Sequence, residues 1–144
     1  MTVESIFQRE VDTADASESV HAAAQRMSSR NVGSLIIVDD ERRPIGIVTD
    51  RDLTLRVLGE ARDPLLCRVG EVMTPSPYVV SLDTGIEDAL SLMRTLAVRR
   101  LPVVDHHGHL AGVVSLHDVL ARLAHELDDV GRLLEETSPR AVAV

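Results

Sequence analysis

The chain has 144 residues, of which 44% are hydrophobic and 26% charged, and its formal net charge is −8. Phe7 and Tyr78 are the only aromatic residues, and all fifteen basic residues are arginines, so the chain contains no lysine. This composition argues against direct nucleic-acid binding, which needs basic patches and stacking platforms. It also excludes Schiff-base and P-loop chemistry, both of which need a lysine.

The sequence predicts a cytoplasmic protein. The first ten residues, MTVESIFQRE, lack the basic start and apolar core of a signal peptide. No apolar run approaches the roughly eighteen residues of a membrane span. Cys67 is the single cysteine, so no intrachain disulfide is possible, and we expect it to be a structural bystander.

In chain order, a polar lead-in at 1–10 precedes a short extended segment, a helix, two strands and a second helix. Ser17 and Ser19 are candidate caps for the first helix, whose apolar residues follow the i, i+3, i+4, i+7 spacing of one buried face. The apolar run at 35–38 is short enough to be a strand buried on both faces. The expected ranges are 11–16, 19–31, 35–38, 44–48 and 50–58.

Residues 61–68 contain Pro64 and mixed charges, and we expect them to form a linker. The second half then repeats the plan with a longer last helix, whose apolar side we interpret as core or as a dimer seam. Its polar side is acidic, which argues against binding to an anionic membrane. The tail from Thr137 is expected to fray. The expected elements are strands 78–80, 101–104 and 110–114 and helices 84–96 and 116–136.

An internal duplication explains why the two halves share a plan. A shift of 66 residues aligns 20–56 with 86–122 without a gap, and ten of the 37 pairs are identical. A unit of roughly 60 residues buries only a marginal core by itself. The duplication therefore predicts an α+β fold in which two units pack together as one body.

Both copies carry a motif at the junction between a strand and a helix. Gly46-Ile47-Val48-Thr49-Asp50-Arg51-Asp52-Leu53 corresponds to Gly112-Val113-Val114-Ser115-Leu116-His117-Asp118-Val119. The hydroxyl residue and the Asp three positions later suit a helix N-terminus that binds phosphate, with a carboxylate that accepts hydrogen bonds from sugar hydroxyls. The same spacing is that of a capping box, which has a purely structural role. Both interpretations are open at this point.

The element order, the motif and the duplication resemble a tandem pair of cystathionine β-synthase (CBS) domains over about 11–127. The resemblance rests on GIVTDRDL/GVVSLHDV together with VGSLIIVD/VRRLPVVD. It implies two β-α-β-β-α units packed through their sheets about a pseudo-twofold axis. We accordingly divide the chain into a first CBS domain with its lead-in at 1–60, a linker at 61–68, a second CBS domain at 69–136 and a tail at 137–144.

The resemblance implies that an adenosine-containing ligand (AMP, ADP, ATP, S-adenosylmethionine or NAD) binds in the cleft between the units, with no cofactor required. It implies that Asp52 and Asp118 bind ribose hydroxyls, and we expect the stronger effect at Asp52. Thr49, Ser115 and Arg100 would contact phosphate. Because Gly33 and Ser34 replace Arg99 and Arg100 in the first unit, we expect unequal occupancy of two sites. The other implied ligand-binding residues are Val32, Ser34, Asp50, Arg51, Val98, Arg99, Pro102 and His117.

Other candidate sites have simpler interpretations. His106, His107 and His109 lie in a predicted hairpin turn without a recognisable pattern of metal ligands, so we expect no metal there. Asp39 and Asp105 occupy equivalent positions at strand ends, which favours turn residues over an acid–base pair.

We expect a regulatory sensor that transmits ligand occupancy to an effector protein through a conformational shift. The alternative is a protein-interaction or dimerisation module with vestigial nucleotide clefts. In either case we expect a homodimer formed through the helices, and neither nucleic acid nor membrane as a partner. We do not expect an enzyme, because the sequence shows no nucleophile–base pair and no metal cluster.

Overall fold

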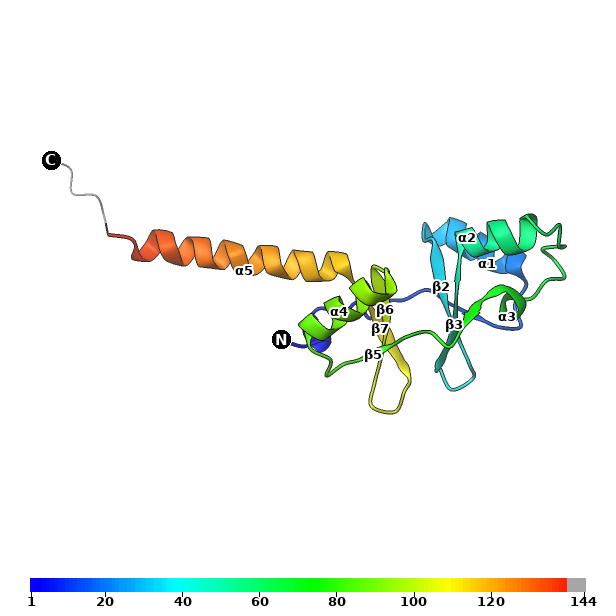
Figure 1. Ribbon diagram of the computed structural model, residues 1–144, viewed down its shortest axis with the longest axis horizontal. Helices are drawn as coiled ribbons and strands as arrows, with labels where there is room; N and C mark the ends of the chain where they lie inside the picture. Colours follow the sequence, from blue (N-terminus) through cyan, green and yellow to red (C-terminus); the bar gives the residue numbers. More distant parts are fainter. Residues whose placement is uncertain (140–144) are drawn as a thin grey trace.

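The computed structural model describes residues 1–139 and contains two α+β units, each built on one small sheet (Figure 1). In both sheets a short strand pairs in parallel with the next strand, which pairs antiparallel with the third. The first sheet has the order β1 (Thr13–Asp15), β2 (Ser34–Val38), β3 (Pro44–Thr49) and β4 (Thr74–Pro75). The second has the order β5 (Val80–Ser81), β6 (Arg100–Val104) and β7 (Leu110–Ser115). The α+β class and the repeated plan are confirmed.

The helices also follow the duplication, and the first long helix of each unit ends in the same way. Asn31 ends the first helix and Ala97 its counterpart, each in the left-handed conformation with φ of 54°. The helix after β3 starts as an ordinary turn and then widens into a π-helical turn. The helical elements are η1 (Val3–Ser5), α1 (Val20–Arg30), α2 (Asp50–Leu53), η2 (Thr54–Leu58), α3 (Val69–Val72), α4 (Ile86–Leu96) and α5 (Leu116–Thr137).

The two hydrophobic cores use equivalent positions of the repeat. Leu35 and Val48 are fully buried in the first unit, and Leu101 and Val114 occupy the same positions in the second. The apolar face of one helix contributes an alanine and a methionine to each core. The helix residues are Ala23 and Met27 in α1, and Ala89 and Met93 in α4.

The N-terminal segments of the two repeats exchange partners. Val3 is fully buried in the core of the second unit, and its amide donates to the carbonyl of Thr84 at 2.8 Å. Conversely, Val69 and Val72 are buried in the core of the first unit, and β4 pairs with β3. The lead-in that we assigned to the first domain therefore packs in the second, and the start of the predicted second domain packs in the first. Isolated valines in polar stretches give no periodic signal, so the sequence did not reveal this exchange.

Two smaller expectations also need correction. The predicted linker 61–68 includes Cys67, which is buried in the first core, and burial raises the pKa of its thiol. The predicted strand at 78–80 is reduced to β5, because only Val80 and Ser81 pair with β6, while Tyr78 is exposed. Most of the predicted tail, 140–144, lies outside the described residues. No helix within 1–139 has both the length and the apolar character needed to cross a membrane.

Candidate functional site

Both strand-to-helix junctions form complete capping boxes. The amide of Asp52 donates to Thr49 Oγ1 at 3.1 Å, and the amide of Thr49 donates to Asp52 Oδ2 at 2.9 Å. In the second copy Asp118 and Ser115 make the same two bonds at 3.1 and 2.8 Å. The structural interpretation of the motif is therefore confirmed in both units. It does not exhaust the carboxylates, because each can accept about four hydrogen bonds.

The two carboxylates differ in what surrounds them. Asp118 is 9% exposed, and its Oδ2 also accepts from Ser115 Oγ at 2.8 Å. Its Oδ1 accepts from the side-chain amide of Gln8 at 3.1 Å. Asp52 instead lies 3.7 Å from the guanidinium of Arg56. Gln8 corresponds to Thr74 in the repeat, and within residues 1–139 no hydrogen bond joins Thr74 to Asp52.

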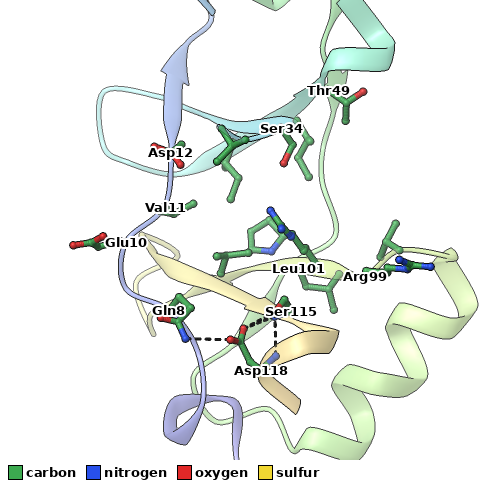
Figure 2. Close-up of a pocket in the computed structure, with 17 residues that line it drawn as sticks. Gln8, Glu10, Val11, Asp12, Ser34, Thr49, Arg99, Leu101, Ser115 and Asp118 are labelled. Atoms are coloured by element: carbon green, nitrogen blue, oxygen red, sulfur yellow. Dashed lines mark hydrogen bonds between the residues drawn. The ribbon is translucent and has the colours of Figure 1, made fainter. Parts of the chain in front are cut away.

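A cavity of about 550 Å³ lies between the two units, a volume within the usual range for small-molecule sites (Figure 2). The first unit contributes residues from β2 and β3, and the second contributes β6, β7 and the first turn of α5. The connection from Gln8 to Asp12 runs along one side, and Asp118 lies at the end nearest Gln8 (Figure 2). The lining residues are Gln8, Glu10, Val11, Asp12, Val32, Ser34, Ile36, Ile47, Thr49, Val98, Arg99, Arg100, Leu101, Pro102, Val113, Ser115 and Asp118.

Nine of the thirteen predicted ligand-binding residues line this cavity: Val32, Ser34, Thr49, Val98, Arg99, Arg100, Pro102, Ser115 and Asp118. The other four, Asp50, Arg51, Asp52 and His117, do not. Asp50, Arg51 and His117 are exposed at the first two positions of their helices, whereas the capping Asp stands at the third. Asp50 lies instead over Gly33, where an added Cβ would meet its Oδ2 at 3.3 Å. Asp118 therefore lines the cavity, whereas Asp52, at which we expected the stronger effect, does not.

Sequence reasoning missed eight lining residues, and for seven of them the reason differs between the strands and the N-terminal connection. Ile36 shares a face of β2 with Ser34, and Ile47 shares a face of β3 with Thr49, so strand alternation could have identified them. Val113 lies two positions before Ser115 and follows the same rule. The connection from Gln8 to Asp12 has no comparable signal, because its place at the cavity follows from the exchange of segments. The missed residues are Gln8, Glu10, Val11, Asp12, Ile36, Ile47, Leu101 and Val113.

The charged residues that line the cavity are two arginines, Arg99 and Arg100, and three carboxylates, Glu10, Asp12 and Asp118. Arg100 pairs directly with Ser115 in the β6–β7 ladder, and Arg99 precedes it. Within residues 1–139 neither arginine forms a salt bridge. On the opposite side Asp12 is already paired with Arg30, at 2.8 Å. Guanidinium groups bind phosphate through two parallel hydrogen bonds, so these two arginines suit a phosphate group.

The described part of the chain, 1–139, contains no group of three or more His, Cys, Asp or Glu side chains placed to hold a metal ion. The rings of His106 and His107 lie 3.9 Å apart in the β6–β7 turn. Asp105 accepts from the amides of His107 and His109, at 2.9 and 3.0 Å, so it acts as a turn residue.

Comparison with known proteins identifies the family to which this architecture belongs. The model of the CBS domain matches the chain twice, at 3–59 and 69–125. Hypoxic response protein 1 of Mycobacterium tuberculosis is 36% identical over 106 residues, which cover 74% of this chain and 73% of that protein. The chain spans 61% of the length of another relative, from Methanopyrus kandleri.

Solved structures agree with these sequence matches. Hypoxic response protein 1, solved with two coordinated zinc ions, has a TM-score of 0.76 and 32% identity over 84% of this chain and 98% of its own. CBSX2 of Arabidopsis thaliana in complex with AMP has a TM-score of 0.73 and 31% identity, covering 88% and 98%. The CBS domain pair of protein MJ0100, in complex with 5′-methylthioadenosine and S-adenosylmethionine, has a TM-score of 0.72 and 25% identity, covering 85% and 98%.

Proposed function

The chain belongs to the CBS domain family as a tandem pair, and from this premise we propose that it is a regulatory module that binds an adenosine-containing ligand between its two units. The observation that carries the proposal is the cavity of about 550 Å³ that joins Asp118 to Arg99 and Arg100. The relatives solved with AMP, and with S-adenosylmethionine and 5′-methylthioadenosine, support this class of ligand. ADP, ATP and NAD belong to the same class.

In this proposal different residues of the cavity recognise different parts of the ligand. The carboxylate of Asp118 accepts hydrogen bonds from the ribose hydroxyls, one of which takes the place of Gln8 on Oδ1. Arg99, Arg100 and the hydroxyls of Ser115 and Thr49 bind phosphate. The apolar wall made by the strands contacts the adenine ring. The module acts by binding and not by catalysis, and it requires no cofactor.

Transmission follows from the position of the cavity. A ligand that touches β2 and β3 on one side, and β6, β7 and α5 on the other, has a different affinity for each relative arrangement of the units. Such a difference is what a ligand needs to shift an equilibrium between conformations. We propose that an effector protein detects the shift and that the module is a homodimer formed through its helices.

Isothermal titration calorimetry with AMP, ATP, S-adenosylmethionine and NAD tests the proposal, with thermal unfolding as a second readout. A ligand that binds the native state raises the apparent stability by about 2.7 kcal/mol at a hundred times its Kd. We expect at least one of these ligands to bind at one site per chain. Guanosine and cytidine nucleotides should give no detectable heat of binding. If none of the four binds, the clefts are vestigial and the alternative, an interaction module, is correct.

A further inference from the structure

Helix α5 extends far from the rest of the protein. It spans Leu116–Thr137, and Figure 1 shows it projecting away from both sheets, with only its beginning near β7. Its buried residues, Asp118 and Val119, lie in the first turn, and every residue from 127 to 137 is exposed. Most helices in proteins owe their stability to the packing of an apolar face. The outer half of α5 has no such packing within residues 1–139.

The exposed part of α5 nevertheless has a regular apolar stripe. Its large hydrophobic residues recur at alternating intervals of three and four, which is the a/d pattern of a coiled coil. Each is between 48% and 71% exposed. We call this stripe the α5 seam, and it consists of Leu120, Leu123, Leu127, Val130 and Leu134.

The charges of α5 leave the seam free to meet an identical seam. Arg122 pairs with Glu126 at 3.3 Å and Arg132 pairs with Asp128 at 3.0 Å, each within the helix. Of the four residues that flank the seam, Ala124, Gly131 and Leu133 are uncharged, and the fourth, Glu126, is the one already paired with Arg122. Two copies that pack seam to seam therefore bring few like charges together, in spite of the net charge of −8.

From this pattern we infer that α5 is a dimerisation arm, whose seam packs against the seam of α5 from a second copy of the chain. A coiled-coil seam needs a partner with the same spacing of apolar residues, and a second copy supplies it. The inference assigns the interface of the homodimer proposed above to one helix. It is independent of ligand binding, because the seam begins beyond Asp118 and shares no residue with the cavity.

Sedimentation velocity of the full chain over a range of concentrations tests the arm. The variant Leu127→Glu/Leu134→Glu places two charges in the seam while keeping residues of good helix propensity. We expect the parent chain to be a dimer at micromolar concentration and this variant to have a dimer Kd raised at least about a hundredfold, because unpaired charges would be buried. The matched control is Leu58→Glu, since Leu58 is 77% exposed on the first unit and lies outside α5. We expect it to remain a dimer.

Two results would overturn the inference. A parent chain that is monomeric would show that the seam does not bind its own copy. A dimer that survives in Leu127→Glu/Leu134→Glu would show that the interface lies outside the seam, and its dissociation in Leu58→Glu would then place the interface on the body of the first unit. Ligand titration of the same variants separates this question from the proposed function, since loss of the dimer with unchanged nucleotide affinity is the expected combination.

Discussion

The side-chain amide of Gln8 donates a hydrogen bond of 3.1 Å to Asp118 Oδ1, although the two residues are 110 positions apart. Together with the two bonds from Ser115 to Oδ2, this bond uses three of the roughly four acceptor positions of the carboxylate. A ribose presents two vicinal hydroxyls, so both cannot bind Asp118 while Gln8 is in place. In the proposed complex, Gln8 and a ribose hydroxyl would therefore compete for the same oxygen.

This competition predicts that Gln8→Met, which keeps the length of the side chain and removes its donor, tightens the binding of AMP. The gain should be about fivefold, or about 1 kcal/mol, which is typical of one partly exposed hydrogen bond. Calorimetric titration of both proteins measures it. Weaker binding by Gln8→Met would mean that Gln8 contacts the ligand instead of competing with it.

The second prediction separates the capping role of the two aspartates from ligand binding. Glu is a good capping-box residue, so Asp118→Glu and Asp52→Glu should both keep the thermal stability of the parent. The extra methylene displaces the carboxylate by more than a hydrogen bond tolerates. Asp118→Glu should therefore weaken AMP tenfold or more, about 1.4 kcal/mol. Asp52→Glu, outside the cavity, is the matched control and should bind within about threefold of the parent. The opposite ranking would contradict the assignment of the site to Asp118.

A third prediction concerns the phosphate end of the cavity. Arg100→Ala should weaken the binding of AMP by roughly 1.5–3 kcal/mol, which is the contribution of a hydrogen bond to a charged group. The binding of adenosine should be almost unaffected. The ratio of the two affinities is the measurement. Arg94→Ala, on α4 and outside the cavity, is the control and should change neither affinity. Equal losses for adenosine and AMP would remove Arg100 from the phosphate site.

Gly112 and Gly46 occupy equivalent positions of the repeat, but replacing each with alanine should lower the free energy of unfolding by a different amount. A Cβ at Gly112 would lie 2.0 Å from the carbonyl oxygen of Gln8, which is held in the pairing with Val113. A Cβ at Gly46 would meet the flexible side chain of Met73 at 2.3 Å. Gly112→Ala should lower the free energy of unfolding by about 1–3 kcal/mol, and Gly46→Ala by less. Urea denaturation of both variants tests the order, and a larger loss at Gly46 would refute it.

The fifth prediction is a pH dependence of stability. The hydrogen bond from Arg26, together with the amide of Asp15, holds the pKa of Glu18 below its ordinary value of 4.5. A carboxyl group whose pKa falls on folding stabilises the native state above pH 4.5, and this contribution disappears as the pH falls through the folded-state pKa. Glu18→Gln should cost about 1 kcal/mol at pH 7, and the cost should shrink on acidification.

Urea unfolding of Glu18→Gln and the parent at a series of pH values measures this effect. Glu60→Gln is the control, because Glu60 forms no salt bridge within residues 1–139. Its difference from the parent should be small at every pH. A cost of Glu18→Gln that is constant from pH 7 into the acid range would show that the ion pair does not contribute through its charge.

The repeat and its buried strands could be predicted because periodic patterns report directly on burial. Leu35 and Leu101, for example, lie in short apolar runs, and both are buried in the cores. The site was harder to predict, because the motif gives the distance between Thr49 and Asp52 along the chain but not which copy faces the cleft. That choice depends on the polar segment around Gln8, whose position follows from the packing of Val3 in the other unit.

Because N-terminal segments are exchanged, we expect the two repeats to fold as a single cooperative unit. A fragment that ended at residue 60 would lack Val69 and Val72 from its core, and a fragment that began there would lack Val3. Neither half of the chain has a complete interior of its own. Neither unit can unfold without exposing part of its neighbour. A ligand or a substitution that changes the stability of one unit should consequently change the stability of the other.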